Sequence, residues 1–402
     1  MSARRTRELA TPLTGEFVLP KVEPGRIYDF PSPSNLMIER LYVHNFRCFE
    51  NFTLDFLGRP SVLLIGKNGT GKSTVLECLR LFQRICRGFN RVRGLISASD
   101  FAQHRTGHPM RFEVELALSG KRYKYALSFE WPAGFREARI LDESLSVDGQ
   151  SVFTREHAQT QLPGGSPFGI DWHIVALPII NARPGERAIE EVKSFLASMV
   201  LVAPIPSNMT GFSEEPSIEL QRDAANYASC LRALLGQKPA AYGVFDSYVK
   251  TVIPDFSSIE NVERGESGTQ LMVKFERENP EHSLTVEFGV LSDGEKCFFL
   301  SAYMIATNTA GWPVFCMWDE PDNHLSLSEV GQFITRLRKM ANQGVQFIAT
   351  THHPETVRKF SDETTFVLTR KSHLDPAVVR PLADFTYNGD LINALIRDEI
   401  IG

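Results

Sequence analysis

The sequence lacks several features that would place the protein in a membrane or outside the cell. It has no apolar run near the roughly 18 residues that a membrane-spanning helix needs. The six cysteines are scattered, without a C-x-x-C pair or metal-ligand spacing, which favours reduced thiols buried in apolar stretches. The N-terminus carries charge but no apolar core of a secretory signal. These absences predict a soluble cytoplasmic protein without a membrane partner.

Strong charge of one sign is also absent. The formal net charge is −5 over 402 residues, so no overall basic field indicates nucleic-acid binding. Hydrophobic residues at 43% and charged residues at 23% are ordinary for a globular protein. The length is sufficient for two domains, or for one domain with a large insertion.

The apolar pattern divides the chain into four predicted parts. Residues 1–36 are rich in proline without an amphipathic period, which favours a flexible or surface-bound extension over an arm that docks on a neighbouring subunit. Residues 37–160 predict an N-terminal lobe with an antiparallel sheet. Residues 161–265 are mainly helical in pattern, and residues 266–402 alternate helix and strand, as in a helix-covered parallel sheet. Hairpin turns are expected at Ser119-Gly120 and Asp148-Gly149.

The stretch GKNGTGKST, residues 66–74, lies between the apolar run SVLLI and a helix predicted from residue 74 to about residue 86. This spacing is typical of a phosphate-binding P-loop (Walker A), whose glycines let backbone N–H groups and a helix N-terminus point at a phosphate. Lys72 would neutralise β- and γ-phosphate oxygens, and Ser73 would bind Mg²⁺. The residues predicted to hold the nucleotide are Gly66, Asn68, Gly69, Gly71, Lys72, Ser73 and Thr74.

A second acidic motif supports this interpretation. The apolar run VFCMW ends in Asp319 and Glu320, as a Walker B strand does. Asp319 would hold Mg²⁺ through water, and Glu320 would orient or deprotonate the attacking water. The alternative is a strand that ends in two surface acids, but the P-loop upstream disfavours it. ATP and Mg²⁺ are therefore the predicted cofactors.

Three further stretches distinguish the classes of P-loop protein. LSDGEK (residues 291–296) resembles an ABC signature at the start of a helix. DEPDNHL (319–325) resembles Walker B with a D-loop, and ATTHHPE (349–355) resembles a switch-histidine loop. The base-recognition motif of GTPases and the H-R-D and D-F-G motifs of protein kinases are absent. The ordered set favours an ABC-type ATPase over these classes and over AAA+ ring motors.

The sequence resembles ABC-type ATPases of the SMC, RecF and OLD group. It is most similar to a branch of small predicted ATPases found in anti-phage systems such as PARIS, Septu and retron modules. The likeness covers roughly residues 37–370 and includes HNFRCFENFTLDF, AANYASCLRAL and VIPDFSSIENV. It implies an α/β P-loop NTPase fold with an ABC-type nucleotide-binding domain. Its expected parts are a mixed, mainly parallel sheet, an antiparallel β-subdomain and a helical insertion.

The resemblance also implies roles for particular residues. Glu320 would be the catalytic base, and His352 would contact the γ-phosphate. Ser292 and Gly294 would contact the nucleotide bound by a partner subunit, and Arg47 would lie near the nucleotide. The residues expected to act in catalysis are Lys72, Glu320 and His352, and those expected to hold the metal are Ser73 and Asp319.

Three positions depart from the family pattern or fit it weakly. Asp293 stands where the signature often has glycine, and His353 stands where a serine often follows the switch histidine. His352 is favoured over His353 as the phosphate contact, and a metal role for the pair is disfavoured because nothing nearby has ligand spacing. Gln103 is a candidate Q-loop residue.

The predicted mechanism is ATP-driven formation of a head-to-tail homo-oligomer, a dimer at least, with ATP sandwiched between subunits. The long segment between Lys72 and Ser292 lacks coiled-coil heptads, and the roughly 50 residues after His352 are too few for a TOPRIM nuclease domain. The predicted function is therefore an ATP-hydrolysing ATPase that controls a separate, nuclease-like effector in anti-phage defence.

The alternative function is that of a RecF- or SMC-like DNA-binding ATPase in repair or recombination. Arg80, Arg84, Arg87 and Arg91 are expected on one helical face, where they could contact a phosphate backbone. An ordinary salt-bridged surface is the other interpretation of this face. A transporter ATPase is disfavoured because the segment after the P-loop is too long.

Overall fold

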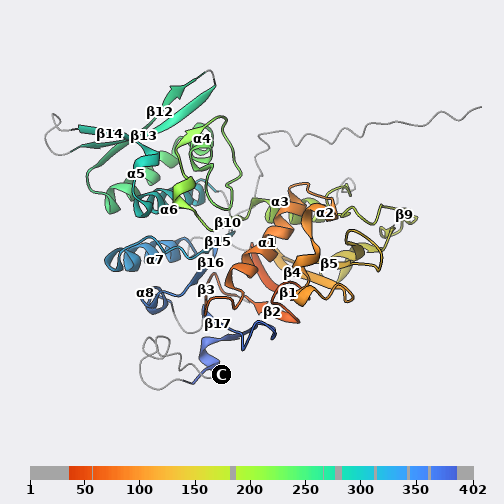
Figure 1. The fold of residues 1–402 in the computed structure, drawn as a ribbon. Helices are drawn as coiled ribbons and strands as arrows, with labels where there is room; N and C mark the ends of the chain where they lie inside the picture. The colour runs from red at the N-terminus through yellow and green to blue at the C-terminus, as the bar shows by residue number, and fades with distance from the viewer. Residues whose placement is uncertain are drawn as a thin grey trace, which may run out of the picture.

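The computed structural model describes residues 36–386, apart from residues 57, 182–186, 266, 277–282, 312–314, 342–344 and 361–363. Its elements form two lobes on either side of a central sheet (Figure 1). The predicted N-terminal extension, residues 1–36, lies outside the described residues except for Leu36, which is buried. The fold class predicted from the sequence, an α/β P-loop ATPase fold, is confirmed.

The central sheet has six strands in the order β10-β15-β16-β3-β17-β18. The first five pair in parallel, and β18 pairs antiparallel with β17. Their bounds are β10 (Val200–Val202), β15 (Phe315–Asp319), β16 (Gln346–Thr351), β3 (Ser61–Gly66), β17 (Thr365–Thr369) and β18 (Val378–Pro381). Such strands are buried on both faces, which explains their continuous apolar runs.

Successive side chains of this sheet enter two different hydrophobic cores. Val62 and Leu64 of β3 pack with α1 (Lys72–Cys86), α3 (Ala188–Ser198) and the antiparallel sheet. Leu63 and Ile65 pack with the helices of the opposite lobe. Because strand side chains alternate between faces, the central sheet separates the two cores and is stabilised from both sides.

The antiparallel subdomain is an eight-stranded sheet in the order β2-β1-β4-β5-β6-β7-β8-β9. The predicted turns between β4 and β5 and between β6 and β7 are confirmed, and their residues have the positive φ angles that such hairpins require. The strands are β1 (Met37–His44), β2 (Phe52–Asp55), β4 (Met110–Leu118), β5 (Lys121–Glu130), β6 (Arg139–Val147), β7 (Gln150–Glu156), β8 (Gln159–Gln161) and β9 (Phe168–Gly169).

The remaining elements form the second lobe and the connections. The helices are α2 (Val92–Leu95), α4 (Tyr227–Gln237), α5 (Ala241–Val252), α6 (Asp293–Thr309), α7 (Leu327–Ala341) and α8 (Pro354–Arg358). A third sheet contains β11 (Phe212–Ser213), β12 (Phe256–Arg264), β13 (Gly268–Glu276) and β14 (Ser283–Glu287). Short 3-10 helices include Ala98–Asp100, Ala102–His104, Pro206–Asn208, Phe288–Val290 and Leu382–Asp384.

The helical pattern predicted for residues 161–265 includes strands that the periodicity did not show. Met199 leaves the helical conformation with a ψ of 141°, and β10 follows it directly. The β-branched residues Val200 and Val202 then pair with Cys316 and Trp318 of β15, so tertiary pairing decides the conformation of this short segment.

The cysteines are free, as the sequence predicted. All six lack a disulfide partner, and only Cys86 is partly exposed. In the part of the chain that the structure describes, every helix is too short or too polar to cross a membrane.

A buried ion pair fastens the antiparallel sheet to the loop that leads into α3. The Glu143 carboxylate accepts hydrogen bonds from the N–H groups of Ala176 and Leu177 at 2.7 and 2.8 Å and from the Tyr125 hydroxyl at 3.0 Å. Nη1 of Arg155 lies 3.5 Å from this carboxylate, and both side chains are fully buried. Burial raises the pKa of Glu143, which the Ala176 N–H and Arg155 only partly oppose.

Replacing Arg155 with methionine should destabilise the fold by about 3–5 kcal/mol, because Glu143 is left buried without its counter-ion. A raised folded-state pKa means that stability falls as the pH rises above the unfolded-state pKa of about 4.3. The loss should therefore be largest near neutral pH and should shrink toward pH 5. Urea denaturation at both pH values measures it.

Two further variants control this measurement. Adding Glu143→Gln to Arg155→Met should recover part of the loss, because the uncompensated charge is removed. Arg122→Met removes a surface ion pair to Glu39 from an arginine whose side chain is 71% exposed, and should cost at most about 1 kcal/mol. A loss in Arg155→Met that is independent of pH would contradict the electrostatic explanation.

Candidate functional site

The carboxyl ends of adjacent parallel strands bring the predicted motifs to one edge of the central sheet. Gly66 ends β3, Asp319 ends β15 and Thr351 ends β16. In the register of the sheet Asp319 pairs with Thr350, and Thr351 pairs with Ile65. Loops that follow these residues meet at the edge where open α/β sheets bind their ligands.

The loop between β3 and α1 borders an open pocket of about 340 Å³. Glycine is required at two places in this loop. A Cβ at Gly66 would lie 2.3 Å from the carbonyl oxygen of Leu368, and a Cβ at Gly71, where φ is 105°, would lie 2.7 Å from the Phe49 ring. The pocket is lined by Arg47, Cys48, Asn68, Gly69, Gly71, Lys72, Ser73, Thr74, Glu320 and Arg370.

The N-terminus of α1 is suited to bind an anion. No side-chain hydrogen bond caps it, and its first turn has no acidic residue, so its N–H groups and positive dipole end face the pocket. Lys72 is only 6% exposed, and its Nζ donates to the carbonyl oxygens of Gly66 and Lys67 at 2.8 and 3.2 Å. Burial lowers the pKa of Lys72, and the carboxylates of Glu320 and Asp319 oppose this shift. These features fit a nucleotide phosphate.

Hydrogen bonds to β16 hold Asp319, the last residue of β15, and Glu320, which follows it. Thr350 donates its hydroxyl to Oδ1 of Asp319 at 2.5 Å and accepts a hydrogen bond from the Glu320 N–H at 3.0 Å. Glu320 has a φ of 53°, a left-handed conformation that costs a non-glycine residue about 1–2 kcal/mol. Its carboxylate accepts a hydrogen bond from Asn323 at 2.5 Å and lies 3.2 Å from Nδ1 of His352. With this left-handed backbone, Glu320 lines the P-loop pocket.

The two adjacent histidines have different surroundings. His353 is the N-cap of α8, and its Nδ1 accepts a hydrogen bond from the Glu355 N–H at 3.2 Å. Its own N–H donates to Oγ1 of Thr351 at 2.8 Å. His352 is 57% exposed and lies beside Glu320. His352 does not line the pocket itself, but its ring takes no part in the helix cap, and its contact with a phosphate stays a prediction.

The signature residues lie apart from the pocket. Ser292 and Gly294 are not among the residues that line it. Ser292 is exposed and begins α6 with a capping box, in which Glu295 donates its N–H to the serine at 3.3 Å. A Cβ at Gly294 would lie 2.8 Å from the carbonyl oxygen of His324, so glycine lets the signature approach the D-loop.

Two weaker predictions for the site have different outcomes. Arg47 lines the pocket, although its guanidinium also forms an ion pair with Asp100 at 3.2 Å. Gln103 does not line the pocket and instead donates to the carbonyl of Leu374, in the loop between β17 and β18. The structure therefore gives no support to Gln103 as a direct nucleotide contact.

Arg370 lines the pocket and was not predicted as a site residue. It follows β17 directly, and its guanidinium donates to the carbonyl oxygens of Gly69, His373 and Asp375 at 3.3, 2.6 and 2.8 Å. The signal was present in TTFVLTR, an apolar strand that ends in a cation. The sequence did not show that this strand lies beside β3, which carries the P-loop.

The predicted arginine face is not a free helical surface. Helix α1 ends at Cys86, so Arg91 lies outside it and Arg87 is its C-cap. The other contacts of these arginines lie within the chain: Arg80 with Glu77, Arg84 with the Phe89 ring and the Gly94 carbonyl, and Arg87 with the Ala197 carbonyl and Glu219. Helix α1 ends at Cys86, as predicted, so the expectation that Arg91 shares its face was wrong. Partners within the chain occupy the guanidinium groups of Arg80, Arg84 and Arg87, which agrees with the interpretation of an ordinary salt-bridged surface.

The family comparison agrees with this geometry. A model described as "AAA domain, putative AbiEii toxin, Type IV TA system" matches residues 61–358, well over half of the chain. The chain belongs to this family. No curated protein matches this AAA domain by sequence.

Solved structures with a similar fold include two SMC head domains. One is the SMC head bound to the C-terminal winged-helix domain of ScpA, with a TM-score of 0.50 and 14% identity over 86% of this chain and 98% of that chain. The other, from Pyrococcus furiosus, is an SMC head with an extended coiled coil bound to the C-terminal domain of ScpA, with a TM-score of 0.53 and 13% identity over 87% of this chain and 97% of that chain. At these identities the likeness shows a shared fold alone.

Substituting the two histidines should separate their roles. His352→Ala should lower ATP turnover on the order of 100-fold, because a polar contact with the reacting phosphate is lost. His353→Ala should cost about 1 kcal/mol of stability through the lost N-cap and leave turnover almost unchanged, while His353→Asn should keep the cap. Steady-state ATPase assays and thermal unfolding measure both effects. A larger loss of turnover in His353→Ala would reverse the assignment.

Arg370→Ala should weaken ATP binding by about tenfold, because a cation and the support of the Gly69 carbonyl are both removed. Arg370→Lys should recover little, because an ammonium group cannot replace three hydrogen bonds from one planar guanidinium. Arg380→Ala, at an exposed position on β18, is the matched control. Titration calorimetry with ATP measures the affinities, and an unchanged affinity in Arg370→Ala would exclude Arg370 from the site.

Proposed function

We propose that this AAA domain binds Mg-ATP in the P-loop pocket and hydrolyses it with Glu320 as the general base. The observation that carries the proposal is the convergence of Lys72 of the P-loop with Asp319 and Glu320 at the end of β15, so that charged groups from two separate segments meet at the edge of the central sheet. Both carboxylates act on the pKa of Lys72, which places them within electrostatic range of the phosphate-binding lysine. An isolated P-loop without such acids would bind phosphate but would have no group to activate water.

Each residue then has a distinct task. Mg²⁺ bound with the nucleotide supplies positive charge that offsets the phosphate charge, and Ser73 and Asp319 are the side chains that would hold it. Lys72 and the N-terminus of α1 orient the phosphates. Glu320 accepts a proton from the attacking water, and His352, whose Nδ1 lies 3.2 Å from its carboxylate, holds the Glu320 side chain and would contact the γ-phosphate.

Completion of the site by a second copy of the chain is the next part of the proposal. Ser292 and Gly294 lie outside the pocket of their own subunit. Ser292 is exposed, so a head-to-tail arrangement places it against the nucleotide of the neighbouring copy. ATP stabilises this oligomer because it contacts both subunits only in the closed state.

The effector is a separate protein, and a nuclease toxin of an anti-phage system is the class that we propose. Two comparisons support a separate partner. The description of the family refers to a toxin–antitoxin system, and both SMC heads named above were crystallised with another protein, ScpA. The RecF-like alternative loses support because Arg80, Arg84 and Arg87 are engaged within the chain.

Glu320→Gln should reduce turnover by about 10²- to 10⁴-fold while ATP binding is retained, because the amide keeps the shape of the side chain but cannot accept the proton. With ATP the variant should therefore accumulate as the closed oligomer, which size-exclusion chromatography with light scattering detects. Glu260→Gln, at an exposed position on β12, is the matched control and should behave as the parent protein.

The same variant tests the partner. Tagged Glu320→Gln purified from its native cells with ATP should bring a nuclease-like protein in a fixed ratio. Nucleic acid alone, lost on replacement of Arg80 and Arg84, would instead support the RecF-like alternative. A monomer that retains ATP would contradict the proposed oligomer.

A further inference from the structure

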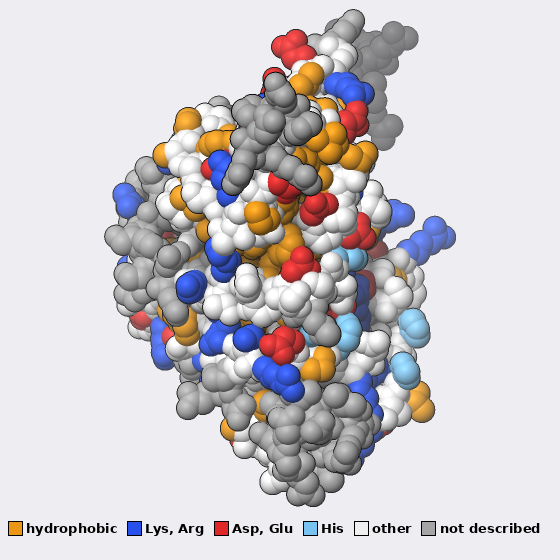
Figure 2. All heavy atoms as spheres, turned by 90° about the vertical axis from the view of Figure 1, so that its left-hand side faces the viewer, with side chains coloured by type: hydrophobic (Ala, Val, Ile, Leu, Met, Phe, Trp, Pro, Cys, Tyr) orange, Lys and Arg blue, Asp and Glu red, His pale blue; other side chains and the backbone are white. Residues whose placement is uncertain are grey.

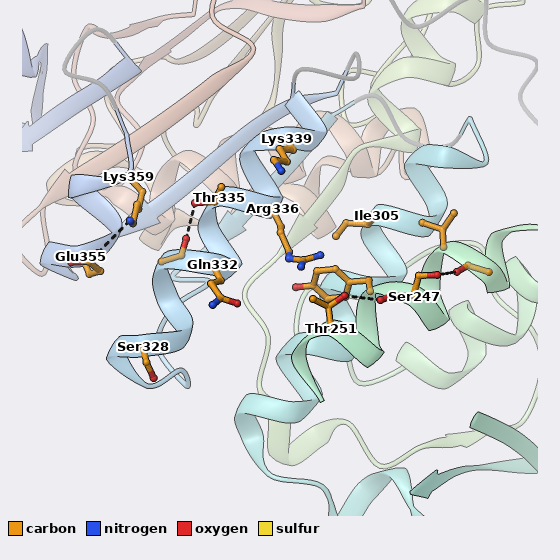
Figure 3. Close-up of a pocket in the computed structure, with 14 residues that line it drawn as sticks. Ser247, Thr251, Ile305, Ser328, Gln332, Thr335, Arg336, Lys339, Glu355 and Lys359 are labelled. Carbon is orange, nitrogen blue, oxygen red and sulfur yellow. Dashed lines mark hydrogen bonds and ion pairs between the residues drawn. The ribbon is translucent and has the colours of Figure 1, made fainter. Parts of the chain in front are cut away.

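A large groove lies outside the ATP site, between α5 and α6 on one side and α7 and α8 on the other (Figure 3). Its volume is about 1010 Å³, near the upper end of the range for small-molecule pockets, so it can hold part of a macromolecule. The groove is therefore large enough for the side chains of a docked polypeptide segment.

Small residues line part of the α5 and α7 walls of the groove. Gly243, Ser247 and Thr251 recur at every fourth position of α5, and Gly331 and Thr335 do so on α7. The hydroxyls of Ser247, Thr251 and Thr335 donate to the carbonyl four residues earlier in their own helix, at 2.7–2.8 Å. These three hydroxyls already have an acceptor, so another helix can pack closely against α5, whereas on α7 the Lys359 side chain lies over Gly331, 3.1 Å from where its Cβ would be.

The charge of the groove is positive. Arg336 reaches from α7 toward α5 and lies 5.2 Å from the centre of the buried Tyr248 ring (Figure 3). Lys339 and Lys359 also line the groove, against the single carboxylate of Glu355, which pairs with Lys359 at 3.7 Å. Among the described residues, no carboxylate lies within ion-pair distance of Arg336 or Lys339.

A space-filling view shows the surroundings of the groove. Figure 2 presents the side on which α5, α7 and α8 lie, and Lys and Arg side chains occur across the middle of this face with Asp and Glu side chains among them. A segment with carboxylates opposite Arg336 and Lys339 would complement this charge and would gain from steering during association.

The walls of the groove also connect directly to the ATP site. Helix α8 follows His352 and His353, and α7 follows the D-loop that begins at Asp319. The opposite wall includes Ile305 of α6, the helix that starts at the signature residue Ser292. An occupant that contacts both walls therefore constrains the signature helix relative to the catalytic loops, so its affinity and the nucleotide state are reciprocally linked.

We propose that this groove binds an acidic α-helical segment of the effector protein and couples that binding to the nucleotide state. The inference rests on the proposed function, since it requires a separate effector. A helix fits better than a nucleic acid, because the Tyr248 ring is buried and cannot stack on a base.

The test places a photo-cross-linking amino acid at Gln332, an exposed position of the groove, in tagged Glu320→Gln expressed in its native cells. After irradiation with ATP present, mass spectrometry of the cross-linked peptide should identify an Asp- and Glu-rich segment of a separate protein. Arg336→Glu with Lys339→Glu should reduce the cross-link at least about tenfold. Lysines in place of the partner's carboxylates should restore it.

The controls separate the groove from the fold and from the proposed function. Arg336→Glu with Lys339→Glu, in the parent background, should keep ATP turnover within about twofold. The matched reversal Lys121→Glu with Arg122→Glu on β5 should leave the cross-link unchanged. The inference would be overturned by a cross-link to nucleic acid or to a second copy of the chain. It would also be overturned if the cross-link were unchanged in the Arg336→Glu and Lys339→Glu variant.

The two proposals can also fail separately. If the effector co-purifies equally well with the Arg336→Glu and Lys339→Glu variant, the groove is not its binding site, while the proposed function stands. If no effector co-purifies with Glu320→Gln at all, the proposed function fails first, and the inference about the groove fails with it.

Discussion

The parallel pairing of β15, β16, β3 and β17 is the constraint on which the rest of the structure depends. Each strand ends at the same edge of the sheet, so four short loops that are distant in sequence become neighbours. One carries the P-loop, one carries Asp319 and Glu320, one carries His352 and one carries Arg370. The two hydrophobic cores hold this sheet from both faces and keep the strand ends in register, and contacts such as those of Arg370 with Gly69 and of His352 with Glu320 then join the loops.

Within that edge, β16 organises its neighbours through two consecutive threonines. Thr350 bonds to the Asp319 carboxylate and to the Glu320 N–H, and so stabilises the left-handed backbone of Glu320. Thr351 donates its hydroxyl to the buried D-loop carboxylate of Asp322 at 2.6 Å. Both hydroxyls lie on the strand that leads to His352, so Glu320, Asp322 and His352 have a common support. A displacement of β16 would move all three together.

Local patterns were sufficient to predict the motifs but not their neighbours in space. The P-loop, the Walker B acids and the hairpins are specified by residues within a few positions of one another, as Gly71 and the positive φ of Asp148 show. Strand order is a property of the whole chain, and for that reason Arg370 was missed and β10 was included in a helical region.

The separation of the signature from the P-loop pocket has a consequence for how ATP could act on a partner. A ligand shifts a conformational equilibrium only by as much as its affinity differs between the two states. In one subunit the nucleotide would contact α1 and the strand ends, whereas Ser292 begins α6 on the opposite wall of the groove. Binding within a single subunit therefore cannot hold the two walls of that subunit against each other. In the proposed oligomer a neighbouring copy would bring its own nucleotide to Ser292, and oligomerisation would then be the step that links ATP to the shape of the groove.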